Sequence, residues 1–294
     1  MGKDVLAKKQ RIWELDFLRG FAIVMVFLDH AFYDFSKLFS SWQGSGVAFL
    51  EWLNELGTLY IGSEVRLLWR PAFLFLFFCV SGLCTAFSRN NFLRGIKVLT
   101  VAMLITVFTY FAEELIGVNA FILFGVLHCI GVIILIYSAV EFIVRGVVRL
   151  SYKIAKKEYN ENISDYVLSA VCLALFIVFA IVNSIYNPPL NEVYEFYATV
   201  PDDTPITGMF FYTKKWRSGD YFPVFPYIAY FFFGAGLTKI IYPRKKSLLP
   251  FLDGKWHTVF SFAGRYSLIC YVGGQVVAIL FGVIASLICF GTLF

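Results

Sequence analysis

The sequence predicts an all-α, polytopic transmembrane helical bundle, and its composition, apolar stretches and charge distribution support this class. Of the 294 residues, 59% are hydrophobic and 15% are charged, whereas soluble domains have about 45–50% and about 25%. Aromatic residues make up 19% of the chain. A soluble fold of this length cannot bury so much apolar surface, so the surrounding medium must be lipid. This excludes a cytosolic enzyme, a disulfide-stapled secreted domain and a nucleic-acid binder.

Seven stretches are apolar and long enough to cross a bilayer, for which about 20 residues are needed. They are 15–37, 71–88, 96–112, 119–141, 165–186, 221–242 and 267–292. The last stretch forms either one long tilted helix or, if it breaks at Gly273-Gly274, two short pieces and an eighth span. The sequence has no internal repeat and no low-complexity tract, so we expect residues 1–294 to form a single membrane domain.

The distribution of lysine and arginine predicts the orientation of these spans. Eighteen of the 25 basic residues fall in one alternating set of segments, six fall in the other, and Arg19 lies inside the first span. Because cytoplasmic segments are enriched in Lys and Arg, the N-terminus is expected in the cytoplasm. Residues 186–220 then form an extracytoplasmic loop. The many aromatic rings of this loop could form a platform that binds the face of a sugar. For most of them we favour the alternative, an aromatic belt at the membrane interface.

The first span contains several ionisable residues, each of which costs about 2.5–3.5 kcal/mol on membrane-insertion scales. Arg19 and His30 are eleven residues apart. At about 100° per residue this spacing places them on one helical face, roughly 16 Å apart along the axis. Asp34 follows one turn beyond His30 on the same arc, whereas Asp29 points elsewhere. One stripe of the helix therefore carries a cation, an imidazole and a carboxylate.

This stripe suits a long donor molecule with an anionic head and a reactive tail. Arg19 could hold a phosphate bidentately at the cytoplasmic mouth. His30, oriented by Asp34, could act as a general base or nucleophile on a thioester. The alternative is that Arg19 extends to the interface and His30 makes an interhelical hydrogen bond. The spacing alone leaves both interpretations open.

Two further polar residues lie in or beside apolar segments. His128, near the middle of the fourth span, forms either a helix–helix hydrogen bond or part of a site where the two membrane faces meet. Asp220 lies where the sixth span meets the outer boundary, next to prolines that should loosen the start of that helix. The six cysteines lie in apolar spans with spacings that match no zinc or redox motif. We interpret them as packing residues and expect no metal site.

Several blocks of the sequence resemble one known family. The first is Arg11-x4-Asp16-Phe17-Leu18-Arg19-Gly20, followed by Met25-Val26-x3-His30. The others, in order, are Phe75-Leu76-x3-Val80-Ser81-Gly82, Arg94-Gly95-Ile96-Lys97, Phe124-Gly125-x2-His128-x2-Gly131, Asp220-Tyr221-Phe222-Pro223-x2-Pro226 and Gly264-Arg265-Tyr266-Ser267-Leu268-x2-Tyr271. Together they resemble short bacterial members of the heparan-α-glucosaminide N-acetyltransferase catalytic-domain family. The spacing from Arg19 to His30 is also similar to that of the wider superfamily of membrane acyltransferases that O-acetylate envelope glycans.

The resemblance implies acetylation across a membrane, expected to be a bacterial plasma membrane. Cytoplasmic acetyl-CoA would donate its acetyl group to an amino or hydroxyl group of a glycan or amino sugar on the other side. His30 would be the acetyl-transfer histidine or base, and His128 and Asp220 would line the acceptor side. A homodimer would be a family expectation. Three basic residues would contact coenzyme A: Arg19, Arg94 and Lys97.

One motif departs from the family pattern and keeps two alternatives open. Relatives usually carry His-Gln-Pro in the last helix, where this chain has Gly274-Gln275-Val276. Gln275 is retained and is expected to bind substrate, but any role of the histidine is lost or moved. The chain could therefore be an inactive membrane partner descended from the enzyme. It could also be a small-molecule or proton-coupled transporter that uses the same buried residues, although the inverted repeats typical of transporters are not visible.

Overall fold

The computed structural model describes residues 12–116, 121–186, 205–212 and 220–291, and every regular element in these ranges is a helix. In chain order they are α1 (Trp13–Tyr33), the π-helix η1 (Asp34–Leu38), the 3-10 turn η2 (Ser40–Trp42), α2 (Ala48–Ile61), α3 (Glu64–Leu83), the 3-10 turn η3 (Cys84–Phe87), α4 (Asn91–Ile116), α5 (Val126–Ile154), α6 (Glu161–Tyr186), α7 (Pro205–Phe210), α8 (Val224–Ile241), the 3-10 turns η5 (Pro250–Leu252) and η6 (Lys255–His257), α9 (Thr258–Arg265) and α10 (Ser267–Phe290). Unit 1 comprises residues 1–77 and 244–294, and unit 2 comprises residues 78–243.

Six helices of the described chain are long and apolar enough to cross a membrane: Glu64–Phe87, Asn91–Leu115, Val126–Ile154, Glu161–Tyr186, Val224–Ile241 and Ser267–Phe290. They correspond to the second to seventh expected spans, so the prediction of an all-α, polytopic membrane protein is confirmed. The first expected span is also helical, as α1. It differs from the other six because Glu14, Asp16, Arg19 and Asp29 interrupt its apolar character.

The structure settles the ends of three expected spans. The fourth span begins at Val126 and not at 119, because Gly125 is the N-cap residue of α5, and the helix continues to Ile154. The last span is one unbroken helix to Phe290, ended by Gly291 at φ 69°, so it does not divide at its glycine pair. The sixth span begins irregularly, as its prolines predicted, with Phe225 at φ −92° and ψ 132°. Most of the expected loop 186–220 lies outside the described residues, which include α7.

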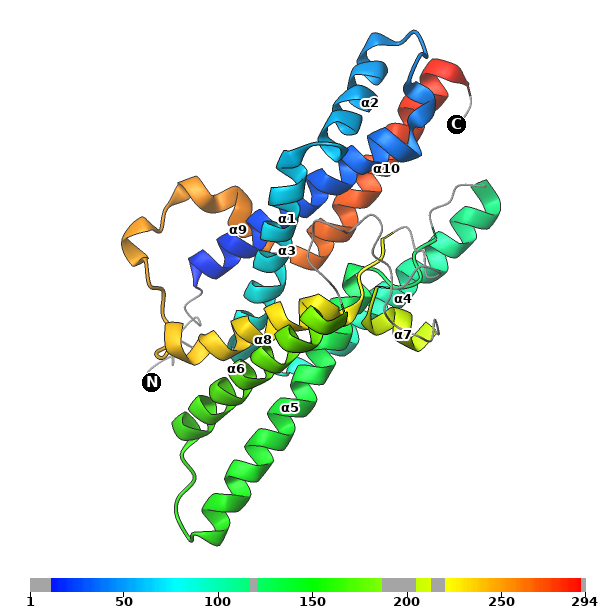
Figure 1. The fold of residues 1–294 in the computed structure, drawn as a ribbon. Helices are drawn as coiled ribbons and strands as arrows, with labels where there is room; N and C mark the ends of the chain where they lie inside the picture. The colour runs from blue at the N-terminus through cyan, green and yellow to red at the C-terminus, as the bar shows by residue number, and fades with distance from the viewer. Residues whose placement is uncertain (1–11, 117–120, 187–204, 213–219, 292–294) are drawn as a thin grey trace, which may run out of the picture. The chain divides into compact units, whose positions relative to one another are not determined.

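Unit 1 is built around α1, with α9 packed across its first half and α10 beside its second half (Figure 1). The crossing of α1 and α9 depends on two glycines. A Cβ atom on Gly20 would lie 1.7 Å from the carbonyl oxygen of Phe260, and one on Gly264 would lie 1.8 Å from that of Asp16. The two backbones are therefore in direct contact, as small residues allow in membrane helices.

The start of α1 is also fixed to the segment that follows α8. Glu14 accepts hydrogen bonds from the Leu248 N–H at 2.6 Å and the Ser247 hydroxyl at 2.8 Å. Trp13 donates from Nε1 to the Leu249 carbonyl and stacks on His257 with ring centroids 4.4 Å apart. These contacts satisfy a buried carboxylate and an indole N–H, and they set the position of the helix that carries Arg19 and His30.

Unit 2 packs α4 on α5 and α6 on α8, and α5 and α6 form a long hairpin (Figure 1). A second glycine pair joins the end of α3 to α8. A Cβ on Gly82 would lie 2.0 Å from the Phe231 carbonyl oxygen, and one on Gly234 would lie 1.9 Å from that of Cys79. Both units thus contain a helix crossing that tolerates no side chain.

Candidate active site

His30 lies in the second half of α1, and its ring is oriented by its own helix. Nδ1 is 3.1 Å from the Val26 carbonyl oxygen. Because a carbonyl oxygen only accepts, Nδ1 must carry the proton of this hydrogen bond, and a neutral ring then has its lone pair on Nε2. The ring also meets Tyr271 of α10 edge-on, with centroids 6.2 Å apart. His30 is therefore held in the tautomer that a general base acting through Nε2 requires.

The other two histidines have both ring nitrogens in hydrogen bonds that hold local structure. His128 accepts from the Gly125 N–H through Nδ1 at 3.2 Å and pairs through Nε2 with the Thr106 hydroxyl at 3.0 Å. It thereby caps α5 and joins it to α4, which agrees with the helix–helix hydrogen bond that the sequence offered as one interpretation. His257 pairs through Nδ1 with Ser261 at 2.7 Å and through Nε2 with Asp253 at 3.0 Å.

Arg19 is partly exposed and contacts α9. Its Nη1 donates to the Gly264 carbonyl at 3.0 Å and lies 3.8 Å from Asp16 Oδ1, while Arg265 lies 3.5 Å from Asp16 Oδ2. The guanidinium thus stabilises the crossing of α1 and α9 at the end of α1 that is expected to face the cytoplasm. A contact with a donor phosphate is not tested by this geometry and stays a prediction.

Asp29 points away from the stripe, as predicted, into a cluster that the sequence did not reveal. Arg66 donates to it from Nε at 2.8 Å and from Nη2 at 3.3 Å, and Arg70 Nε lies 3.5 Å away. The Tyr60 hydroxyl donates at 3.1 Å. Burial and the nearby Asp29 carboxylate raise the pKa of Tyr60 to about 12. The cluster joins α1, α2 and α3, and the arginines at positions 66 and 70 were its only sequence signal.

Asp34 and Gln275 complete the predicted residues of unit 1. Asp34 begins the π-helical turn after α1, four residues beyond His30, and its orienting role stays a prediction. Gln275 lies one helical turn after Tyr271 in α10. Its Nε2 atom is buried and has no hydrogen-bond partner among the described residues. Gly274 faces Phe27, since a Cβ there would lie 2.9 Å from Cδ2 of the ring.

In unit 2 the structure brings together the two residues expected on the acceptor side. Asp220 accepts a hydrogen bond through Oδ2 from the Val126 N–H at 3.3 Å. A Cβ on Gly125, the residue bound by His128, would lie 2.8 Å from the same oxygen. Asp220 and His128 therefore meet at the first turn of α5, where the helix dipole favours a carboxylate.

The two basic residues predicted in α4 differ in their surroundings. Arg94 donates to the Ser81 hydroxyl at 2.5 Å and to the Ser81 carbonyl at 3.2 and 3.3 Å, which ties the start of α4 to the end of α3. Lys97 is exposed. Of the two, Lys97 therefore has the more accessible charge, and its contact with coenzyme A stays a prediction.

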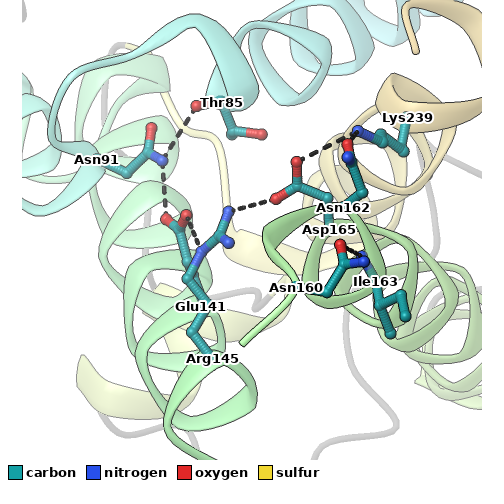
Figure 2. A network of polar contacts seen from close by, with 9 residues as sticks. All are labelled: Thr85, Asn91, Glu141, Arg145, Asn160, Asn162, Ile163, Asp165 and Lys239. Carbon is teal, nitrogen blue, oxygen red and sulfur yellow. Dashed lines mark hydrogen bonds and ion pairs between the residues drawn. The ribbon is translucent and has the colours of Figure 1, made fainter. Parts of the chain in front are cut away.

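A network of charged residues that the sequence did not reveal connects four helices of unit 2 (Figure 2). Arg145 contacts Glu141 at 3.0 Å and Asp165 at 2.9 Å. Asp165 also contacts Lys239 at 3.4 Å, and Asn91 donates to Glu141 at 2.9 Å. The network thus contains two cations and two carboxylates in alternation, which balances its charge.

The cysteines and the possible metal ligands of the described residues form no disulfide and no metal cluster. All six cysteines are free, and Cys79, Cys84, Cys129 and Cys172 are buried. In the part of the chain that the structure describes, no group of three or more His, Cys, Asp or Glu side chains could hold a metal ion.

These features define a multi-pass helical membrane protein with an oriented histidine and paired charges inside its helices. The family model described as "Heparan-alpha-glucosaminide N-acetyltransferase, catalytic" matches residues 11–155 and 162–276. The match covers most of the sequence, so the chain belongs to this family of membrane acetyltransferases, and the resemblance is confirmed. No curated protein and no solved structure matches the chain.

Proposed function

We propose that this protein moves an acetyl group from cytoplasmic acetyl-CoA to an amino or hydroxyl group of a glycan or amino sugar outside the cytoplasm. The observation that carries the proposal is the hydrogen bond from His30 Nδ1 to the Val26 carbonyl at 3.1 Å. In the neutral form of the ring this bond makes Nε2 the basic nitrogen, in a chain that belongs to an acetyltransferase family. A bacterial plasma membrane and a homodimer are further parts of this proposal.

The reaction needs one proton carrier and no external oxidant. In direct transfer, His30 Nε2 takes the proton of the acceptor N–H or O–H while the acceptor atom attacks the thioester carbonyl carbon. The π electron pair of the thioester carbonyl moves to its oxygen as the acceptor adds. The pair then returns to form the carbonyl group again as the C–S bond breaks. The coenzyme A thiolate that leaves takes the proton from His30. A two-step route would instead form and break an acetyl–Nε2 bond.

The remaining predicted residues take roles that fit their surroundings. Asp34 would orient or stabilise the His30 imidazolium, and Gln275 would bind substrate near it. His128 and Asp220 would line the acceptor side at the start of α5. The coenzyme A phosphates would contact three basic residues: Arg19, Arg94 and Lys97.

The test combines acetyl-CoA binding by calorimetry with acetyl transfer to glucosamine by the purified protein. His30→Ala should lower transfer by about 10²–10⁴-fold, the usual contribution of a general base, with the acetyl-CoA Kd within a few-fold. Leu28→Ala is the matched control, because Leu28 lies on the same helix and is exposed; it should transfer normally. Full activity of the His30 variant would refute its role.

The donor end is tested separately with Arg19→Ala. Loss of a phosphate contact should weaken acetyl-CoA binding, and thermal unfolding measured in parallel shows whether the α1–α9 crossing has survived. An unchanged Kd would remove Arg19 from the donor site. No binding at millimolar acetyl-CoA to the unmodified protein would refute the acyltransferase proposal and favour a transport path through the same residues.

One observation favours a second candidate, a non-catalytic member of the family. Gly274 replaces the usual histidine, and Phe27 lies against the position that a side chain would occupy. Such a protein would bind acetyl-CoA and release no free coenzyme A in the presence of any acceptor tested. That result would separate it from both the enzyme and the transporter.

A further inference from the structure

Gln275 has an unusual environment for a residue in a membrane helix. Its side-chain Nε2 is buried and has no hydrogen-bond partner in the described chain. A buried amide group without a partner costs free energy, and such groups are rare in native proteins. An orphan donor of this kind is available to a partner that the described residues do not supply.

Contacts of α10 with α1, and with η1 and Phe39 that follow it, place Gln275 at the level of His30. Phe27 lies against Gly274, Phe35 against Phe281 with centroids 6.3 Å apart, and Phe39 against Gly282. These contacts advance in the same direction, so the two helices run parallel. In this register Gln275 is level with the helical turn that follows Phe27. The His30 ring bends back to the Val26 carbonyl, and therefore toward the same level.

The same register shows on which side of the contact Gln275 lies. At 100° per residue, Tyr271 and Gln275 are 40° apart around α10, on the same side of Gly274. Tyr271 is buried, and its ring meets the His30 ring on that side. The orphan donor and the imidazole therefore flank the same edge of the α1–α10 interface.

The chemistry of acyl transfer requires such a pair of groups. When a nucleophile attacks a thioester, the carbonyl oxygen becomes an oxyanion, and a neutral N–H donor aimed at it lowers the barrier. The proton of the acceptor must at the same time move to a base. An amide N–H beside a histidine lone pair supplies both functions.

We propose that Gln275 Nε2 donates a hydrogen bond to the acyl oxygen during transfer at His30. This inference rests on the proposed function and assigns one atom of its transition state. The Gln275 amide forms and breaks no covalent bond. Its N–H stabilises the acyl oxygen while the π electron pair of the thioester carbonyl resides there, and this stabilisation is no longer needed when the C–S bond breaks.

Gln275→Leu, which deletes the donor and retains similar volume, tests the inference. We expect kcat for acetyl transfer to fall about 10²–10³-fold, the effect of removing one oxyanion donor. The acetyl-CoA Kd should stay within three-fold. Gln275→Glu keeps the shape but presents a carboxylate to the oxyanion, so its kcat should be lower still.

Thermal stability distinguishes catalysis from a structural role. Since Nε2 has no partner within the described protein, Gln275→Leu should leave the melting temperature unchanged or raise it. The matched control is Ser286→Ala on the same helix. Ser286 accepts a hydrogen bond from buried Trp42 at 2.8 Å, so this variant should melt at a lower temperature and keep its kcat.

The outcomes separate this inference from the proposed function. If the unmodified protein transfers acetyl groups and Gln275→Leu retains its kcat, the inference is wrong and the proposed function stands. A lowered melting temperature in Gln275→Leu, or a loss confined to acetyl-CoA affinity, would also overturn it. If the unmodified protein transfers no acetyl group, the proposed function is wrong, and the inference that rests on it is wrong with it.

Discussion

Replacing Arg145 by methionine should destabilise unit 2 by about 3 kcal/mol. Arg145 lies 3.0 Å from Glu141 and 2.9 Å from Asp165, whose side chains are only 22% and 18% exposed. Removing one partner of a buried ion pair costs about 3–5 kcal/mol, because the remaining charge is left uncompensated. We take the lower end of this range because these side chains keep some contact with solvent. On the scale of soluble domains, the melting temperature should fall by roughly 6–12 °C.

The buried cysteines provide the assay for this prediction. Cys79, Cys84, Cys129 and Cys172 are buried and all belong to unit 2, so a thiol-reactive fluorogenic dye reports the unfolding of that unit. Cys270 and Cys289 of unit 1 are replaced by alanine in the parent to remove the background. Labelling is then followed as the detergent-solubilised protein is heated.

Two comparisons make the Arg145 prediction refutable. Arg149→Met, one turn later on α5, removes an exposed arginine that lies over the Tyr159 ring at 5.4 Å, and it should change the melting temperature by less than about 3 °C. Adding Glu141→Gln to Arg145→Met should recover part of the loss, because the Glu141 carboxylate that Arg145 paired with is then absent, while Asp165 keeps its contact with Lys239. An Arg145 variant as stable as its parent, or no recovery in the double variant, would refute the reasoning.

Three further predictions follow from single contacts. Gly264→Ala should prevent folding, because the added Cβ would lie 1.8 Å from the Asp16 carbonyl oxygen. Gly273→Ala is the control and should fold normally, because nothing lies within 4 Å of its added atom. The yield of monodisperse protein is measured for each variant. The raised pKa of Tyr60 favours its neutral form in the folded state, so this stabilisation is complete below pH 10 and is lost toward about pH 12. The melting-temperature difference between parent and Tyr60→Phe should shrink over that range, and a constant difference would contradict this. His128→Ala leaves the Gly125 N–H without its imidazole acceptor and should lower the free energy of unfolding by about 1–3 kcal/mol. The acetyl-CoA Kd of this variant should stay within three-fold of the parent value. An unchanged melting temperature would argue against the capping role of His128.

The sequence predicted the spans well because a membrane helix is recognised from its own residues. Apolar length and charge identified six helices that the structure contains, and Pro223 and Pro226 predicted the irregular start of α8. Helix ends were less accurate: α3 begins at Glu64 with Pro71 inside it, and α5 continues to Ile154 although Arg145 and Arg149 interrupt its apolar run.

Contacts between helices could not be predicted in the same way. Asp29 and Arg66, or Arg145 and Asp165, are far apart in sequence, and no periodicity within one helix indicates which distant charge it meets. His30 shows the same limit. Its helical face was predictable, but the Val26 hydrogen bond that sets its tautomer depends on a side-chain rotamer.

The altered motif of the last helix explains two features of α10 together. The family resemblance would place proline where this chain has Val276, and a proline there would remove a backbone donor from the helix interior and interrupt it. With valine, α10 runs unbroken from Ser267 to Phe290. With Gly274 in place of histidine, the Phe27 ring packs directly against the backbone. In unit 1, His257 is hydrogen-bonded through both ring nitrogens to Ser261 and Asp253, and His30 is the histidine that we propose as the base. Under the proposed mechanism, the retained Gln275, whose Nε2 is buried without a partner in the described residues, is the part of the motif that contributes to transfer.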